Sequence, residues 1–339
     1  MTAGARMAAE MAEQPAVLAR LAARAEAVAA TARALAPSPL AGTAIVARGS
    51  SDHAAVCGRY LLELASGRPV SLAAPSLHLL YGARVDYGGQ LAIAVSQSGR
   101  TPEIVATLER LRAAGARALA ITNDGDSPLA AAADATLALG AGAELAVPAT
   151  KTVTGELLLF ALLARALGPV PFGDAELAAL PALVQEVLDD PQPARLAAAA
   201  LADATRLVVT ARGLLYGAAL ETALKLQETT GVAADAIAAA DLRHGPIAIV
   251  GAGFPVIALS APGPARDDVA ALVATLRERG ARVLEIACDE EAALPLPPLP
   301  EALAPVVAVV RAQQLARELA LARGREPDAP AGLRKVTAT

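Results

Sequence analysis

The feature that most constrains the fold of this chain is an internal repeat. Residues 46–67, VARGSSDHAAVCGRYLLELASG, superpose without a gap on residues 210–231, TARGLLYGAALETALKLQETTG. The matches include the Ala-Arg-Gly opening, the Ala-Ala pair and the closing glycine. Further on, GARALAIT from Gly115 pairs with GARVLEIA from Gly280. Self-similarity over such a long distance indicates a duplicated domain.

Each half of the chain alternates short apolar runs with helical patterns. The runs are TAIVARG, LAIAVSQSG and ALAITN in the first half, and RLVVTARG, PVIALSAPG and VLEIAC in the second. Near-continuous apolar strands that alternate with helices are typical of a parallel sheet covered on both faces. The sequence therefore predicts an α/β fold with two tandem, doubly wound, flavodoxin-like parallel sheets.

The composition excludes several classes of protein. A net charge of −5 and an aromatic content of 2% provide neither a basic surface nor stacking platforms, so we expect no nucleic-acid partner. The longest dense apolar stretch, LLLFALLA, is too short to span a bilayer, so we expect no membrane association. The first residues lack the apolar segment of a secretory signal, and we expect a cytoplasmic protein. The two cysteines, Cys57 and Cys288, lack metal-ligand spacing, and we expect no disulfide.

A hydroxyl-rich loop follows one of the apolar runs of the first half. In SQSGRTPE, Ser96, Gln97, Ser98 and Thr101 stand just before a helix that we expect to begin near Pro102. Hydroxyl groups, backbone N–H groups freed by glycine and a helix dipole all favour a bound phosphate. The alternative is a helix cap without a ligand. The equivalent loop of the second half, SAPGPARDD, has lost most of these hydroxyl groups, which favours the phosphate in the first half. The serines of RGSSDH, Ser51 among them, either add a contact or cap a helix.

Lysine is rare in this chain. Of 29 Lys and Arg residues only Lys151, Lys225 and Lys335 are lysines, so arginine is used wherever a positive charge alone is needed. An amine differs from a guanidinium because burial can neutralise it and it can attack a carbonyl group. The retained lysines are therefore candidates for chemistry. Lys151, in the helix opening PATKTVT, is either a charge at the start of the helix or a group near a ligand.

The second half carries a second set of reactive groups. Lys225 and Glu228 are three residues apart on one helix face, within reach of a common ligand, or else they form an exposed ion pair. His244 stands before Gly-Pro on a loop, where it is either a general acid or base or a surface residue. We interpret His53 and His78 as structural.

Six motifs in order closely resemble the tandem sugar isomerase (SIS) domain family. They are GSS, SQSGRTPE, ELAVPATKTVT, ALKLQETTG, LRHGP and the terminal GLRKVT, and the resemblance covers nearly the whole chain. The most similar members are the isomerase half of glucosamine-6-phosphate synthase and stand-alone deaminase-like relatives. The resemblance implies a helical arm over 1–40, a phosphate-binding SIS domain over 41–168, a helical linker over 169–203, a catalytic SIS domain over 204–325 and a closing tail over 326–339.

The resemblance also implies roles for particular residues. The phosphate loop corresponds to Ser96, Gln97, Ser98 and Thr101, a sugar-contacting serine to Ser51, and a backbone contact to the sugar to Val147. Glu228 corresponds to the carboxylate that moves a proton between C1 and C2, with Lys225 beside it. His244 corresponds to the ring-opening acid or base that a neighbouring subunit contributes. Lys335 corresponds to the tail lysine that forms an imine with the open-chain ketose.

These implications lead to a functional hypothesis. We expect a homodimer, without metal ion or cofactor, that converts glucosamine 6-phosphate to fructose 6-phosphate and ammonia. The chain begins MTAGAR and has no cysteine before Cys57, so we expect no built-in ammonia source, and deamination is the favoured direction. Two alternatives are a fructosamine-phosphate deglycase or other phosphosugar isomerase, and a phosphosugar-binding regulatory protein. A regulator needs the phosphate loop but not Lys225, Glu228, His244 and Lys335.

Overall fold

The protein consists of two compact units, which are described separately. The structure is a computed structural model, and it describes residues 2–335. Of these, the N-unit holds residues 16–144 and 151–170, and the C-unit holds the rest. The last four residues of the expected tail, 336–339, lie outside the described residues.

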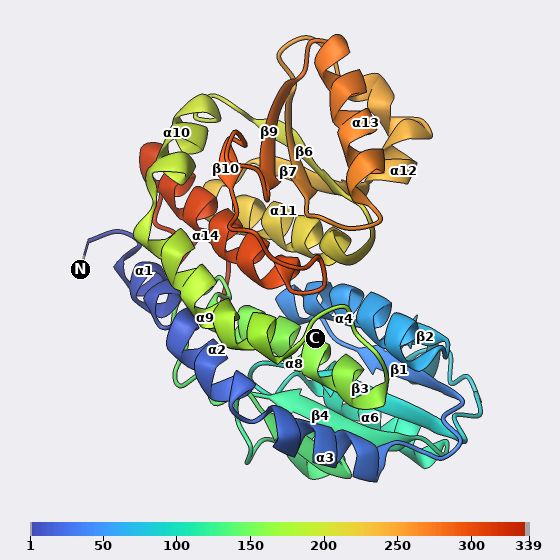
Figure 1. The fold of residues 1–339 in the computed structure, drawn as a ribbon. Helices are drawn as coiled ribbons and strands as arrows, with labels where there is room; N and C mark the ends of the chain where they lie inside the picture. Colours follow the sequence, from blue (N-terminus) through green and yellow to red (C-terminus); the bar gives the residue numbers. More distant parts are fainter. Residues whose placement is uncertain (1, 336–339) are drawn as a thin grey trace. The chain divides into compact units, whose positions relative to one another are not determined.

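The N-unit is built on a parallel sheet of five strands in the order β2-β1-β3-β4-β5. The strands are β1 (Gly42–Val46), β2 (Val70–Leu72), β3 (Gln90–Val95), β4 (Arg117–Thr122) and β5 (Ala135–Ala138). Helices cover both faces: α3 and α4 pack with α8 on one face, and α5 and α7 pack with α6 on the other. Figure 1 labels α3, α4, α6 and α8. Their bounds are α2 (Gln14–Ala22), α3 (Ala25–Leu35), α4 (Ser50–Ser66), α5 (Pro75–Leu79), α6 (Pro102–Ala113), α7 (Pro128–Ala132) and α8 (Lys151–Leu167).

The C-unit repeats this architecture. Its five parallel strands lie in the order β10-β9-β8-β6-β7, the same succession of strands counted from the start of the unit. They are β6 (Arg206–Ala211), β7 (Ala233–Ala238), β8 (Pro255–Ser260), β9 (Arg282–Ala287) and β10 (Leu294–Pro295). The α/β fold with two doubly wound parallel sheets is thereby confirmed.

Helices also cover both faces of the C-unit sheet. Figure 1 shows α11 and α14 against one face and α12 and α13 against the other, while α9 and α10 pack on α14. The bounds are α1 (Ala5–Ala12), α9 (Asp174–Asp189), α10 (Gln192–Ala200), α11 (Tyr216–Thr230), α12 (Ala239–Arg243), α13 (Arg266–Glu278) and α14 (Ala304–Ala322), with short 3₁₀ turns η1 (Gly213–Leu215) and η2 (Pro246–Ile249).

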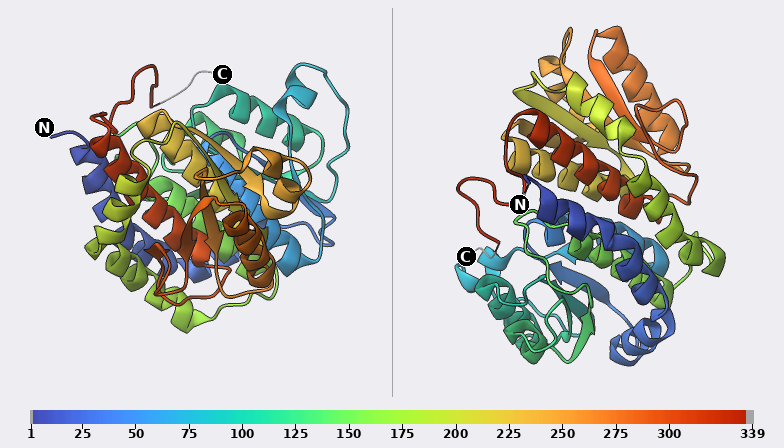
Figure 2. Two further views of the ribbon diagram at one scale, coloured as in Figure 1. Left: turned by 90° about the horizontal axis from the view of Figure 1, so that it is seen from above. Right: turned by 90° about the vertical axis from the view of Figure 1, so that its left-hand side faces the viewer.

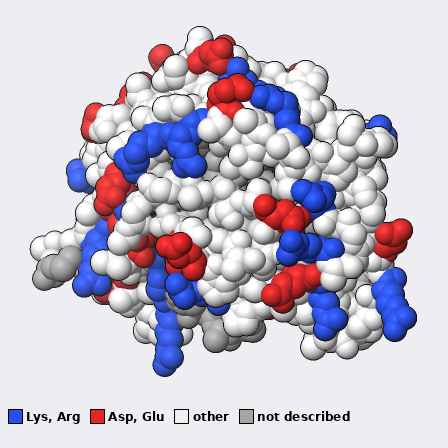
Figure 3. All heavy atoms as spheres, turned by 90° about the horizontal axis from the view of Figure 1, so that it is seen from below, with Lys and Arg blue, Asp and Glu red and all other residues white. Residues whose placement is uncertain are grey.

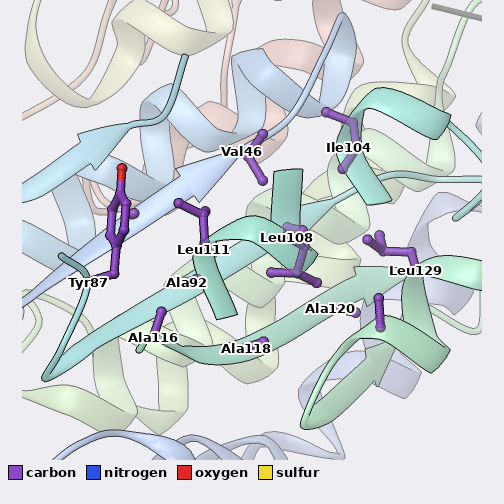
Figure 4. Packing of buried hydrophobic residues seen from close by; sticks show 13 residues of the cluster. Val46, Tyr87, Ala92, Ile104, Leu108, Leu111, Ala116, Ala118, Ala120 and Leu129 are labelled. Atoms are coloured by element: carbon purple, nitrogen blue, oxygen red, sulfur yellow. The ribbon is translucent and has the colours of Figure 1, made fainter. Parts of the chain in front are cut away.

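The core of the N-unit pairs small strand residues with large helix residues. On one face of the sheet, alternate strand positions carry alanines, among them Ala92 and Ala118, while Ile104, Leu108 and Leu111 project from α6 (Figure 4). The three helix residues share one face because their spacing follows the helical repeat. Small side chains on the strands let the helix approach closely, so large and small residues fill the layer together.

The duplication is visible in individual contacts. The helices α4 and α11 both end at a glycine with positive φ, Gly67 and Gly231, a conformation that favours glycine because it has no Cβ. An arginine after the first strand of each unit pairs with an acid in the helix after the third strand. Arg48 Nε lies 2.8 Å from Glu103 Oε2, and Arg212 Nη1 lies 2.8 Å from Asp268 Oδ2.

Surface charge agrees with the composition. On the face drawn in Figure 3, acidic and basic side chains are interspersed around a broad area without charged groups. Among residues 2–335, no helix is both long and apolar enough to cross a membrane.

Candidate active site

The strand order defines where each unit offers a ligand site. In the N-unit the order reverses between β1 and β3, and in the C-unit between β6 and β8. In open parallel sheets, ligands bind beyond the carboxyl ends of strands at such a reversal, because the two loops diverge there. The loops at the N-unit reversal contain Ser51 and residues 96–101, so the strand order brings the expected phosphate-binding residues to adjacent loops.

The loop 96–101 has a well-defined geometry. Ser96 is buried at the end of β3, and its Oγ lies 3.3 Å from Oγ1 of Thr101. Gly99 has a φ of +62°, and a Cβ there would lie 2.1 Å from Ser127 Oγ, so only glycine fits. Helix α6 begins at Pro102, as the sequence predicts. The turn therefore leads directly into the N-terminus of α6, where free backbone N–H groups and the helix dipole favour a bound anion.

The polar side chains of this loop are not engaged as helix caps. Thr101 stands at the N-cap of α6 but makes no side-chain capping hydrogen bond. Ser98 Oγ accepts a hydrogen bond from Arg100 N–H at 3.2 Å, which leaves its hydroxyl proton available to an acceptor. Gln97 contributes only its backbone carbonyl, which accepts from Asn123 N–H at 3.0 Å and from the Thr122 hydroxyl at 3.3 Å. These contacts favour the anion-binding interpretation of the loop over simple capping.

Ser51 has a partner inside the N-unit. It lies in the first turn of α4, is buried, and donates a hydrogen bond of 2.9 Å to Glu156 Oε1 on α8. Its oxygen remains an acceptor, so any contact with a sugar hydroxyl would have the sugar as donor. Sequence reasoning overlooked Glu156 because it stands in an apolar helix 105 residues away.

The corresponding reversal in the C-unit carries a carboxylate instead of hydroxyl groups. Glu301 is buried, and a Cβ placed on Gly263 would lie 1.9 Å from its Oε2, while one on Gly213 would lie 3.8 Å from its Oε1. The carboxyl group thus lies between the loops that follow β6 and β8. Burial raises the pKa of Glu301. A carboxylate at this position would repel a bound anion. This agrees with the C-unit loop, SAPGPARDD, which lacks most of the hydroxyl groups of the N-unit loop.

The C-unit holds a buried ionic cluster on α11. Lys225 Nζ lies 2.5 Å from Glu228 Oε2 and 3.4 Å from Glu221 Oε1. The side chains of Lys225 and Glu221 are 0% and 1% exposed, whereas that of Glu228 is 19% exposed. The exposed ion pair is therefore excluded, and Glu228 is the member of the cluster that a ligand can reach. Sequence reasoning missed Glu221, although its spacing of four residues from Lys225 is a recognised helix pair.

Lys225 stays charged in this cluster. Burial alone would lower the pKa of its ammonium group, but the charges and hydrogen bonds of Glu221 and Glu228 outweigh that effect, and the pKa is raised. A protonated lysine is not a nucleophile. Its ammonium group holds the carboxylate of Glu228 in place.

The internal repeat shows that the fold does not require these charges. In the alignment of the two repeats, Glu221, Lys225 and Glu228 correspond to the apolar residues Cys57, Leu61 and Leu64 of α4. Cys57 and Leu61 are buried, so the same helix positions accept apolar side chains. Burying ions is costly, and apolar residues of similar volume often do as well or better. The cluster is therefore better explained by chemistry than by packing.

His244 lies apart from this cluster. It caps the carboxyl end of α12, and its side chain is exposed next to Gly245. Helix α12 packs in a cluster with β6, β8 and α13, which is the face of the C-unit sheet opposite α11. Among residues 2–335, His244 forms no side-chain hydrogen bond or ion pair with Lys225 or Glu228. The structure thus joins Lys225 with Glu228 but does not join His244 to them.

The remaining predicted site residues, Val147 and Lys335, lie in irregular segments of the C-unit. Val147 donates its N–H to the backbone carbonyl of Asp328 at 2.9 Å. Its carbonyl group is therefore the part left to contact a sugar. Lys335 is partly exposed, seven residues beyond Asp328.

Other residues singled out in the sequence have mainly structural surroundings. Lys151 is buried at the first position of α8, so it is not a solvent-exposed charge. His78 is buried, its Nε2 lies 3.1 Å from the Tyr87 hydroxyl, and burial lowers its pKa. Cys57 is buried and Cys288 half-buried, and neither forms a disulfide bond. Within residues 2–335, no group of three or more His, Cys, Asp or Glu side chains is arranged to hold a metal ion.

This arrangement corresponds to a known family. The SIS domain model matches residues 43–166 and 200–297, which together make up more than half of the chain. The protein belongs to the SIS domain family, as the motifs indicated. It is 36% identical over 301 residues to the isomerizing glutamine–fructose-6-phosphate aminotransferase of Methanothermobacter thermautotrophicus. That match covers 86% of this chain and 50% of the relative, so the chain spans about half the length of the curated relatives it matches.

Solved structures show the same relationship. A Silicibacter pomeroyi protein, described provisionally as a phosphosugar isomerase, has a TM-score of 0.87 and 32% identity and covers 95% of this chain and 99% of its own. The C-terminal domain of glucosamine-fructose-6-phosphate aminotransferase from Francisella tularensis has a TM-score of 0.87 and 25% identity, with coverage of 96% and 98%. The inferred homology with the isomerase half of this aminotransferase is thereby confirmed.

The phosphate loop yields a testable prediction for Ser98. Replacing Ser98 by alanine removes one hydroxyl donor, so we expect affinity for a sugar phosphate to weaken by about 1 to 3 kcal/mol. Affinity for the unphosphorylated sugar should barely change. Isothermal titration of both ligands measures the difference, and equal losses would show that residues 96–101 do not bind the phosphate.

The buried cluster predicts a large stability effect for Lys225. Lys225→Met leaves Glu221 buried without its cation, so we expect a loss of about 3 to 5 kcal/mol of unfolding free energy in the C-unit. Adding Glu221→Gln should restore part of the loss because the second change removes the uncompensated charge. Urea unfolding at neutral pH measures both variants. A loss below about 1 kcal/mol in the single variant would contradict a charged Lys225 in this cluster.

Proposed function

We propose that this protein is a phosphosugar isomerase of the SIS family that acts on an amino-sugar phosphate. The preferred substrate is glucosamine 6-phosphate, and the products are fructose 6-phosphate and ammonia. The observation that carries the proposal is the ionic cluster of α11, in which Glu228 is reachable and Lys225 is held charged behind it. The aminotransferase relatives, named for fructose 6-phosphate, support the class of substrate.

The chemistry assigns each residue a task. The phosphate group is held by the loop of Ser96, Gln97, Ser98 and Thr101, with Ser51 and the Val147 carbonyl toward the sugar. After ring opening, Glu228 removes the proton from C2 and returns it to C1, while a proton passes from the C2 amine to the C1 oxygen, so the C2 amine becomes a ketimine. Lys225 keeps the Glu228 carboxylate oriented for the first step. Neither step requires a metal ion or an organic cofactor.

Release of ammonia involves the tail lysine. In its neutral form, the Lys335 amine attacks the C2 ketimine, ammonia departs, and an imine between Lys335 and the ketose remains. Water then hydrolyses that imine to fructose 6-phosphate and the free lysine. Glucosamine 6-phosphate plus one water thus gives fructose 6-phosphate plus one ammonia. A guanidinium in place of Lys335 would keep the charge but would not form the imine.

A screen for ammonia release tests the proposal. Glucosamine 6-phosphate should yield ammonia and fructose 6-phosphate in equal amounts. Ammonia from fructosamine 6-phosphate instead would identify a deglycase, and ketose formation from an aldose phosphate without ammonia would identify a simple isomerase. Binding of every sugar phosphate without turnover of any would identify a regulatory protein.

A variant of Glu228 tests the proton-transfer step. Glu228→Gln keeps the size of the side chain but removes the base, so we expect exchange of the C2 proton with solvent deuterium to slow by about 10² or more. Substrate should still bind. Glu63→Gln is a matched control, because Glu63 is also a helix carboxylate near a basic side chain, Arg59, but 47% exposed on α4. Exchange at the normal rate in Glu228→Gln would assign the base to another residue.

We further propose that a second copy of the chain supplies His244 for ring opening, so that the working enzyme is a homodimer. The position of His244 across the sheet from α11 supports this arrangement. A mixed dimer of Glu228→Gln and His244→Ala subunits should then recover one complete site, while each parent dimer stays nearly inactive. An inactive mixture with demonstrated subunit exchange would mean that one chain provides the whole site.

A further inference from the structure

We infer that Asp328 and Glu10 are positioning residues, which fix the base of the Lys335 tail and the Val147 loop to helix α1. The contacts involved, all within the C-unit, form what we call the tail anchor: the start of α1 at residues 4–10, the loop 145–147 and the segment 326–328. The inference rests on the proposed function, because it assigns these residues to the same reaction.

Asp328 connects three segments of the chain. Its Oδ1 accepts a hydrogen bond from Met7 N–H at 2.8 Å, and its Oδ2 accepts one from Arg6 N–H at 2.9 Å. Its backbone carbonyl accepts the Val147 N–H at 2.9 Å. One residue at the base of the tail therefore binds both the amino-terminal helix and the loop expected to contact the sugar. Figure 2 shows the carboxyl-terminal segment, in red, beside the blue amino-terminal helix.

The carboxylate of Asp328 serves as the N-terminal cap of α1. Helix α1 has glycine at its own N-cap, no side-chain cap and no acidic residue in its first turn. A negative charge at this end is favourable because free N–H groups and the helix dipole point toward it. The cap comes from a residue 321 positions later in the chain. Helix α1 and the base of the tail thus depend on each other for their placement.

Two further side chains hold the segment beside Gly4. Glu326 Oε1 accepts Gly4 N–H at 3.0 Å and Asp328 N–H at 2.9 Å. These backbone hydrogen bonds lower the pKa of Glu326, so it is ionised at neutral pH. Arg317 Nε on α14 donates to the Gly4 carbonyl at 3.1 Å. The anchor is consequently attached to the long helix that packs on the sheet.

Glu10 holds the other side of the Val147 loop. It is 5% exposed, and its carboxylate accepts hydrogen bonds from Leu145 N–H and from Ala146 N–H, the latter at 3.2 Å. Met7 and Met11 pack with Ala146, so apolar contacts close the same junction. A buried carboxylate directed at two consecutive backbone N–H groups leaves the loop little freedom to shift.

The anchor sets what Lys335 can reach. Lys335 lies seven residues beyond Asp328, so even a fully extended tail keeps its Cα within roughly 25 Å of the Cα of Asp328. Terminal segments are poorly ordered unless something holds them, and the hydrogen bonds of Asp328 hold this one at its base. Imine formation needs the amine within bonding approach of C2, where a shift of about 1 Å can cost about 10²-fold in rate. Asp328 and Glu10 therefore affect turnover without contacting the substrate.

The test separates positioning from plain stabilisation. In Asp328→Ala we expect kcat to fall by about 10- to 100-fold, with the Kd for inorganic phosphate unchanged within about twofold. Borohydride trapping with fructose 6-phosphate should give a correspondingly smaller yield of adduct on Lys335. Asp328→Asn keeps one oxygen acceptor and should recover part of kcat. Glu10→Gln should raise KM more than it lowers kcat, because Val147 faces the sugar.

Asp134→Ala provides a matched control. Asp134 is likewise a carboxylate that accepts a backbone N–H from another segment, that of Ala118 on β4 at 2.8 Å, but it lies just before β5 in the N-unit. This variant should lose stability and keep kcat. Lys335→Arg should give no adduct.

The outcomes distinguish the two proposals. Absence of an adduct in the wild-type protein would overturn the imine step of the proposed function, and this inference with it. An adduct in the wild type, with Asp328→Ala and Asp328→Asn giving unchanged kcat per folded molecule, would overturn the inference alone. So would a fall in kcat matched by an equal loss of phosphate affinity. If Asp328→Ala does not fold, the inference is tested by the kcat of Asp328→Asn and by the KM of Glu10→Gln. Wild-type values in both variants would overturn it.

Discussion

The rest of the structure depends on one constraint, the parallel order of strands that reverses beside the first strand of each sheet. Parallel strands place all their carboxyl ends at one edge, and the reversal opens a gap between two loops at that edge. Both units inherit this gap from the duplication, with glycines at corresponding positions, Gly99 and Gly263. What differs is the chemistry placed in it. In the N-unit the loops offer hydroxyl groups and a helix N-terminus, whereas in the C-unit the carboxyl group of Glu301 takes the space.

Divergence after duplication divided the chemistry between the repeats. Helix α4 kept apolar side chains at the positions where α11 has Glu221, Lys225 and Glu228. Apolar residues fill those positions in α4, so the fold of α11 does not require charged residues there. Burying the charges of the cluster lowers stability relative to apolar side chains. The C-unit in turn lacks the hydroxyl-rich loop of the N-unit and has SAPGPARDD at the equivalent position. The hydroxyl groups of the loop and the ionic cluster thus stand on different repeats.

Much of the fold could be predicted from the sequence, and the failures have a physical pattern. The six apolar runs all form strands, but β2, β5, β7 and β10 went unnoticed, and all four are edge strands. An edge strand has a neighbour on one side only, so it can be short or partly polar, and it shows no continuous apolar run. The candidate site divides in a similar way. Local features such as the loop 96–101 and the pair Lys225–Glu228 could be predicted from the sequence, because their residues are neighbours in the chain. Partners distant in sequence, such as Glu156 for Ser51 and Asp328 for Met7, were not.

The scarcity of lysine acquires a physical explanation from these surroundings. Arginine is planar, weakly hydrated and always charged, so it suits the exposed pairs with carboxylates that recur on both units. Lys225 occupies a buried position between two carboxylates, where a compact ammonium reaches both Glu221 and Glu228 from one helix face. Glu221 and Glu228 raise the pKa of Lys225, so its amine stays protonated and does not attack a carbonyl group. An amine that attacks a carbonyl group must first give up its proton, and the carboxylates around Lys225 oppose that loss. Lys151 is likewise buried, at the start of α8, whereas Lys335 is partly exposed, and the proposed function accordingly assigns the imine to Lys335.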